Sequence, residues 1–330
     1  MKFILCTGDS HTVGQYSDGY DVSSWRPRSL GYNSNGKGFN NVNPKGRDYV
    51  NLVKHYVLDH TNSKVEYVDI TSWGKDFAHF RKLERPVTID GGCDSIILRL
   101  AEKKEKATIG VYLDGKLFRT KELYAEETKF GLWSITYMMI PCAGAKEITL
   151  KAEEGSVFVD ICERWTGDYA VVNGGVGSCA SFTYKDELLP VLLEEFPDRI
   201  FVAEVHTIND WAQCRTVEQY RESLTELLQT MKDNSDMVFP VTVSPILWEE
   251  PMPEPWVKVD FYENYVTASY EVIKKLNLPI IDAHKAFLEK MEGKTVDELI
   301  GTLYGDKLHP AQPGYTLYAE LIIEKLKDIL

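Results

Sequence analysis

Hydrophobic positions near the start of the chain follow the pattern of a layered α/β protein. An apolar run at 2–6 is typical of a buried strand. Residues 47–59 carry apolar side chains at a helical spacing, and residues 65–70 are again strand-like. This order predicts a β-loop-α-β unit at the beginning of an α/β fold.

From about residue 73 to residue 166 the helical spacing disappears, and short strand-like runs alternate with turns. Asp114 and Gly115 form a pair that favours the positive φ angles of a tight hairpin turn. Many short strands separated by turns predict a small β-sandwich. The runs that carry this prediction are 95–100, 108–123, 132–141, 147–152 and 157–165.

After Thr166 strands alternate with helices again. Such an alternation predicts a parallel sheet with helices on both faces. We therefore expect an α/β/α domain built from residues 1–72 and 167–330, interrupted by an all-β insert at 73–166. The predicted strands are 169–173, 199–205, 237–245 and 279–283, and the predicted helices are 185–196, 216–233, 262–277 and 313–330.

Composition narrows the class of protein. The chain has 330 residues, of which 44% are hydrophobic and 26% charged, as in ordinary globular proteins. A net charge of −13 argues against nucleic acid or an anionic membrane as partner, because both attract clustered Lys and Arg. No apolar run is long enough to predict a membrane span. The six cysteines are scattered without metal-ligand spacing, so we expect reduced thiols and no metal or other cofactor. The short apolar start does not resemble a signal peptide, and we expect a cytoplasmic protein.

Polar and glycine-rich segments follow several of the predicted strands, where functional groups of a parallel sheet gather. Four such segments stand out. A separate glycine, Gly74, follows the predicted strand at 65–70. The four are Gly8-Asp9-Ser10-His11, Gly174-Gly175-Val176-Gly177-Ser178, His206-Thr207-Ile208-Asn209-Asp210 and Asp306-Lys307-Leu308-His309-Pro310.

These residue types suit acyl transfer. A serine hydroxyl is a weak nucleophile until a base takes its proton, and His309 can act as that base for Ser10. Asp306 can orient the imidazole and stabilise its charged form. The oxyanion of a tetrahedral intermediate needs fixed N–H donors, which the Ser10 N–H, the Gly177 N–H and the Asn209 amide could supply.

The four segments resemble, in order, the four sequence blocks of the SGNH (GDSL-type) hydrolase superfamily. "GDSH" resembles the nucleophile block with Ser10, and "DKLHP" resembles the last block with Asp306 and His309. "HTIND" resembles the third block with Asn209, although Thr207 stands where the family usually has Gly. "NGGVGS" resembles the glycine block, but its second glycine, Gly177, falls one residue early, so the Ser178 N–H is a fallback donor.

This resemblance implies a flavodoxin-like α/β/α hydrolase that acts on esters without a metal. Many members remove acetyl groups from carbohydrates, and the insert resembles the jelly-roll-like β-sandwich modules found beside carbohydrate esterases. The resemblance covers residues 1–72 and 167–330. We expect the insert either to shape the active-site cleft or to bind glycan, with packing or dimerisation as the alternative.

Simpler roles compete with the chemical ones. Ser10 and Asp9 could merely cap a helix, and Gly74 competes with Gly177 as an oxyanion donor. Possible substrate contacts at the same sheet edge are Asp9, Ser178, Asp210, Trp211 and Trp248.

The sequence thus predicts a serine esterase for short acyl groups, in the first place acetyl, on a carbohydrate such as an acetylated xylo-oligosaccharide. The alternatives are a lysophospholipase or thioesterase of the same family and a non-catalytic glycan-binding protein. A small ester substrate is the expected partner, and a homo-oligomer is compatible with the sequence.

Overall fold

The computed structural model describes residues 1–330 except 19–45, 69, 71–80, 126–133 and 249–260. Its first component is a parallel sheet whose strand order is β11-β1-β12-β13. Ile281 extends this sheet through a parallel bridge to Val241 beyond β13. Numbered along the chain, these five positions have the order 2-1-3-4-5, which is that of flavodoxin-like folds. The strands are β1 (Lys2–Gly8), β11 (Tyr169–Gly175), β12 (Arg199–Glu204) and β13 (Met237–Val241).

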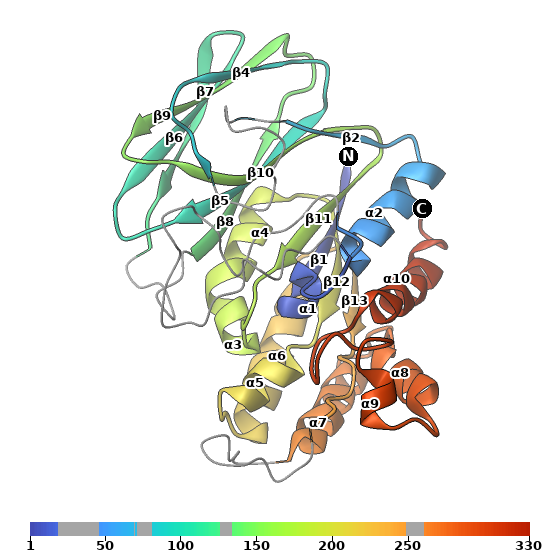
Figure 1. Cartoon of the computed structure of the whole chain (residues 1–330). Helices are drawn as coiled ribbons and strands as arrows, with labels where there is room; N and C mark the ends of the chain where they lie inside the picture. The colour runs from blue at the N-terminus through green and yellow to red at the C-terminus, as the bar shows by residue number, and fades with distance from the viewer. Residues whose placement is uncertain (19–45, 69, 71–80, 126–133, 249–260) are drawn as a thin grey trace.

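Helices cover both faces of the parallel sheet (Figure 1). Helix α6 illustrates why: it begins at a capping box formed by Thr216 and Gln219, and buries Tyr220, Leu224 and Leu228 on one stripe. None of the helices in the described parts of the chain is long and apolar enough to cross a membrane. The helices are α1 (Ser10–Val13), α2 (Tyr49–His60), α3 (Ser181–Thr183), the π-helical turn η4 (Tyr184–Leu188), α4 (Leu189–Glu195), α5 (Thr207–Ala212), α6 (Val217–Asp233), α7 (Tyr262–Lys275), α8 (Ala283–Met291), α9 (Val296–Leu299) and α10 (Gln312–Leu326).

Two antiparallel sheets form the all-β part of the molecule. The inner sheet has the order β2-β10-β5-β8 with β3 beside β10, and the outer sheet has the order β4-β9-β6-β7. The predicted hairpin turn is confirmed, because Asp114 and Gly115 between β6 and β7 have φ angles of 49° and 75°. The inner strands are β2 (Lys64–Tyr67), β3 (Arg81–Lys82), β5 (Ser95–Glu102), β8 (Ser134–Pro141) and β10 (Phe158–Thr166); the outer strands are β4 (Val87–Asp90), β6 (Ala107–Leu113), β7 (Lys116–Leu123) and β9 (Glu147–Glu154).

The inner sheet is buried on both faces. Along β5, Ile96, Leu98 and Leu100 face the outer sheet and share an apolar core with it, as in a β-sandwich. The intervening Ile97 and Ala101 belong instead to the core of the α/β part. This explains why β5 is a nearly continuous hydrophobic run rather than an alternating one. The jelly-roll connectivity of the sandwich stays a prediction.

One predicted strand lies in a different sheet from the one expected. Residues 65–70 were expected to continue the parallel sheet, but β2 pairs antiparallel with β10, with Val65 opposite Trp165. The all-β part therefore includes residues from Lys64 on, before the predicted boundary at 72/73, which itself lies outside the described residues. A four-residue strand carries too few alternating positions to reveal which sheet it joins.

Candidate active site

The turn after β1 brings Ser10 to the carboxyl edge of the parallel sheet. Gly8 ends the strand, and a Cβ at this position would lie 2.2 Å from Oγ1 of Thr12, so only glycine allows this close approach. The Asp9 side chain accepts a hydrogen bond from the His11 N–H at 2.9 Å and caps α1, of which Ser10 is the first residue. The capping role considered for Asp9 is thus observed, and it places the Ser10 side chain next to His309.

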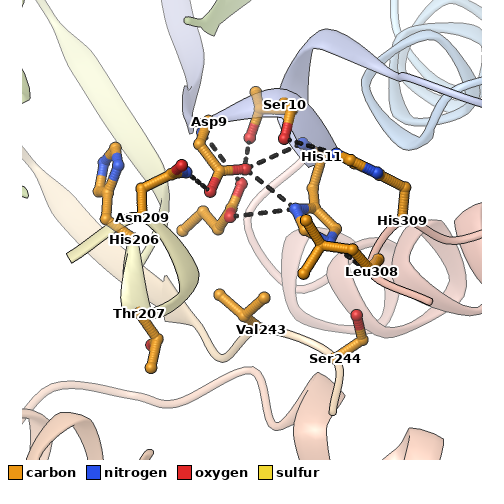
Figure 2. A network of polar contacts seen from close by, with 12 residues as sticks. Asp9, Ser10, His11, His206, Thr207, Asn209, Val243, Ser244, Leu308 and His309 are labelled. Atoms are coloured by element: carbon orange, nitrogen blue, oxygen red, sulfur yellow. Dashed lines mark hydrogen bonds and ion pairs between the residues drawn. The ribbon is translucent and has the colours of Figure 1, made fainter. Parts of the chain in front are cut away.

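Ser10, His309 and Asp306 form a continuous chain of hydrogen-bonding side chains. Oγ of Ser10 lies 3.0 Å from Nε2 of His309, and Nδ1 of His309 lies 3.0 Å from Oδ2 of Asp306 (Figure 2 shows the first contact). Oδ1 of Asp306 accepts the N–H groups of Leu308 and His309 at 2.7 and 2.6 Å. Partial burial opposes ionisation of Asp306, but its bonds to His309 outweigh this and lower its pKa to about 2. The structure therefore brings these three side chains together in the geometry of a nucleophile, a base and an orienting carboxylate.

The candidate oxyanion donors come from the ends of neighbouring strands. Gly8 of β1 pairs with Gly175 of β11, and Gly177 follows two residues later. Asn209 lies on α5, directly after β12, which flanks β1 on the other side. The side-chain amide nitrogen of Asn209 donates a hydrogen bond to Oδ2 of Asp9, which fixes the orientation of the amide and leaves its second N–H for another acceptor. The roles of Gly177 and Asn209 as oxyanion donors stay predictions.

Side chains of the all-β part donate hydrogen bonds to the backbone at the end of β11, just before the glycine turn. The guanidinium of Arg99, on β5, donates to the Gly175 carbonyl at 3.0 Å, and the Tyr137 hydroxyl, on β8, donates to the Asn173 carbonyl at 2.5 Å. Arg99 is buried and also forms an ion pair with Asp160. Thus two strands of the inner antiparallel sheet contact the backbone just before Gly177.

Three of the possible substrate contacts are fully buried. Asp9, Asp210 and Trp211 have no exposed surface, so a bound substrate cannot reach their side chains in this conformation. Asp210 instead accepts hydrogen bonds from the N–H and hydroxyl of Ser181, at 2.7 and 3.0 Å, and so links the third block to the segment after the glycine turn.

The two other possible contacts, Ser178 and Trp248, keep some exposed surface. Ser178 is nearly buried, has a φ of 60°, and its carbonyl accepts from Gln213 at 2.9 Å. Trp248 is partly exposed beside Trp211, with ring centroids 6.1 Å apart, and stays a candidate. Gly74 lies outside the described residues.

Sequence reasoning missed three residues beside the triad. Glu204 and His11 are both buried, next to the segment that carries Ser10. The ring of Tyr16 stacks on that of His309, with centroids 5.4 Å apart. A glutamate directly after the apolar run "IFVA" was one available signal, since a charge in a buried strand requires a partner.

Comparison with solved structures supports the fold. The chain is similar to a peptidoglycan O-acetylesterase, with a TM-score of 0.50 and 12% sequence identity over 100% of this chain and 91% of the other. A Bacillus subtilis protein gives 0.46 and 12% over 81% and 88%, and an acetylxylan esterase from Geobacillus stearothermophilus gives 0.37 and 16% over 48% and 72%. No family model matches the sequence, and no curated protein does. The chain therefore shares its overall fold with that peptidoglycan O-acetylesterase, which agrees with the α/β/α architecture expected from the sequence.

Proposed function

We propose that this protein is a serine esterase that hydrolyses short-chain acyl esters, and that its substrate class is acetylated carbohydrate. The observation that carries the proposal is the chain of contacts from Ser10 through His309 to Asp306, with 3.0 Å at each step. A hydroxyl, an imidazole and a carboxylate in this order are the machinery for nucleophilic attack on an acyl carbonyl.

The mechanism follows from these positions. Nε2 of His309 takes the proton of Ser10 as Oγ attacks the acyl carbonyl, and Asp306 holds the ring with its N–H on Nδ1. The oxyanion is stabilised by the N–H groups of Ser10 and Gly177 and by the second amide N–H of Asn209. His309 then gives its proton to the departing alcohol. Water enters, loses a proton to His309 and releases the acid from the acyl-enzyme.

Two considerations favour acetylated carbohydrate within the ester class. One solved structure that resembles this chain over its whole length is named a peptidoglycan O-acetylesterase, which supports an acetyl ester on a sugar as the first substrate to test. The net charge of −13 suits a neutral substrate better than an anionic lipid surface.

The test compares wild type, Ser10→Ala and Ser17→Ala on 4-nitrophenyl acetate. Ser17 is a buried serine on the same loop whose hydroxyl donates only to the Gly14 carbonyl, so it controls for loss of a hydroxyl. We expect Ser10→Ala to lower kcat by at least roughly 10⁴-fold and Ser17→Ala to remain active. A Ser10→Ala variant as active as wild type contradicts the proposal.

Two further measurements define the substrate. Acetate release is measured on acetylated xylan, xyloglucan, chitin oligosaccharides, sialic acid and peptidoglycan, and acetyl is compared with decanoyl esters. Preference for decanoyl esters would indicate a lysophospholipase or thioesterase instead. Failure of a fluorophosphonate probe to label Ser10 would indicate a non-catalytic binding protein.

A further inference from the structure

The side chain of His11 lies between the two segments that carry the nucleophile and the base. It directly follows Ser10 and has no exposed surface. Its Nδ1 lies 2.9 Å from Oδ1 of Asp9, and its Nε2 lies 3.2 Å from the carbonyl oxygen of Leu308, the residue before His309 (Figure 2). One imidazole therefore spans the turn after β1 and the loop before α10.

Both partners of this imidazole are acceptors. A backbone carbonyl can only accept, so Nε2 must carry a hydrogen to bond with Leu308. Asp9 accepts the His11 N–H at Oδ1 and the Asn209 amide at Oδ2, so its carboxylate also acts as an acceptor towards Nδ1. A ring that donates from both nitrogens is an imidazolium, because the neutral ring has a single N–H.

The charges around the ring agree with this protonation state. Burial opposes the charge on His11, but the carboxylates of Asp9 and Glu204 outweigh it and raise its pKa to about 9. Burial also opposes ionisation of Asp9, but its contacts with His11 hold the pKa of Asp9 well below its usual range. Burial, with the nearby charge of Asp9, raises the pKa of Glu204 well above its usual range.

The remaining groups that face His11 come from three elements. Glu204, on β12, has Oε1 3.8 Å from Nδ1 of His11. The rings of His309, before α10, and Tyr318, on α10, have centroids 5.4 and 6.5 Å from that of His11. Asp9 and His11 carry opposite charges and lie 2.9 Å apart, which lowers the cost of burying each of them.

We propose that His11 is a positioning residue. As a buried imidazolium it connects the turn that carries Ser10 to the loop that carries His309, and so keeps the two reacting side chains at hydrogen-bonding distance. This role rests on the proposed esterase function and deepens it. His11 acts through its neighbours: Asp9 passes the constraint to Asn209, and the Leu308 carbonyl passes it to His309.

A metal site is the competing use of this cluster. One ligand atom from each of Asp9, His11 and Glu204 lies within 4.8 Å of the others. However, both ring nitrogens of His11 face acceptor oxygens and carry hydrogens, so neither has a lone pair to offer a cation. The contacts are those of an ion pair.

The first test reads the protonation state without measuring activity. Nitrogen-15 NMR of the imidazoles at pH 7, assigned by the signal lost in His11→Asn, should show both ring nitrogens of His11 protonated. The ring should lose a proton only near pH 9. A single protonated nitrogen at pH 7 would overturn the proposal.

The second test separates the two contacts. In His11→Asn the shorter amide can reach Asp9 but not the Leu308 carbonyl, and in His11→Gln the longer amide can reach the carbonyl but loses the Asp9 contact. We expect each variant to lower kcat roughly 10- to 100-fold with KM changed less than about twofold, because small misplacements of reacting groups have effects of this size. His284→Asn is the matched control, since His284 is also buried and its Nδ1 lies 2.9 Å from the Val243 carbonyl oxygen.

The pH profile completes the test. Wild-type kcat, corrected for uncatalysed hydrolysis, should fall as pH rises through about 9, and this limb should be absent from His11→Asn. If wild type hydrolyses esters and labels at Ser10 while His11→Asn keeps wild-type kcat or the same limb, the positioning role is wrong and the esterase function stands. If wild type neither hydrolyses esters nor labels at Ser10, the esterase function itself is wrong.

Discussion

Replacing Asp306 with Asn should abolish the proposed esterase activity by changing the tautomer of His309. Two backbone N–H groups point at Oδ1 of Asp306 from 2.6 and 2.7 Å, so the amide oxygen of the new side chain must take that place. The reverse orientation would leave two N–H donors facing an NH₂ group, which costs about 1–3 kcal/mol for each. The NH₂ group therefore faces Nδ1 of His309, which must become an acceptor.

The consequence reaches Ser10 through the ring. A neutral imidazole that accepts at Nδ1 carries its hydrogen on Nε2, and Nε2 is the atom 3.0 Å from Oγ of Ser10. In this tautomer it cannot take the serine proton. The corresponding change in other Ser-His-Asp triads lowers kcat about 10⁴-fold, which corresponds to about 5 kcal/mol of activation free energy.

The assay is kcat on 4-nitrophenyl acetate for wild type, Asp306→Asn and Asp306→Ala, with the melting temperature measured in parallel. The alanine variant has no amide to select the wrong tautomer, so we expect it to be impaired no more than Asp306→Asn. A folded Asp306→Asn protein that keeps more than a tenth of wild-type kcat would refute the reasoning.

Two further predictions concern the neighbouring blocks. Asn209→Ala should lower kcat by roughly 10²–10³ with little change in KM, and Asn209→Asp should be worse because it adds a carboxylate beside Asp9; equal kcat for wild type and both variants would exclude an oxyanion role. Burial, opposed by bonds from Ser181, raises the pKa of Asp210 to about 7. An acid whose pKa is higher in the folded than in the unfolded protein destabilises the fold increasingly as pH rises from about 4 to about 7. The free energy of unfolding of Asp210→Asn, relative to that of wild type, should therefore rise by on the order of 3 kcal/mol between pH 5 and pH 8. Urea unfolding at both pH values measures this, and a pH-independent difference would contradict it.

Local patterns were sufficient to predict most elements of the fold. Helix α6 and the hairpin at Asp114 and Gly115 were predicted because apolar spacing and turn residues act over a few positions. The pairing of β2 with β10 depends on contacts across about a hundred residues, and nothing within Lys64–Tyr67 encodes them. The strand at 279–283 was also expected, but only Ile281 bridges to the sheet.

The same division holds for the site. Ser10, Asp306 and His309 were predictable because chemistry restricts which residue types can serve and the strand ends place them at one edge. Asp210 and Trp211 were predicted to contact substrate because they directly follow Asn209 in its sequence block. Their burial depends on tertiary packing, which the sequence does not reveal. His11 was missed for the opposite reason, since a histidine beside a nucleophile gives no sign that two distant oxygen atoms enclose it.

The contact of Arg99 with the Gly175 carbonyl means that the two parts of this molecule are not separable modules. Excising the two antiparallel sheets would remove the guanidinium and the phenol hydroxyl that contact carbonyls at the edge of the parallel sheet, and would expose the apolar side chains of the α/β core that Ile97 and Ala101 of β5 cover. The α/β part alone would then be expected to aggregate or to lose the shape of its glycine turn. An engineered protein in which the two antiparallel sheets are replaced by those of another protein would have to retain Arg99 and Tyr137.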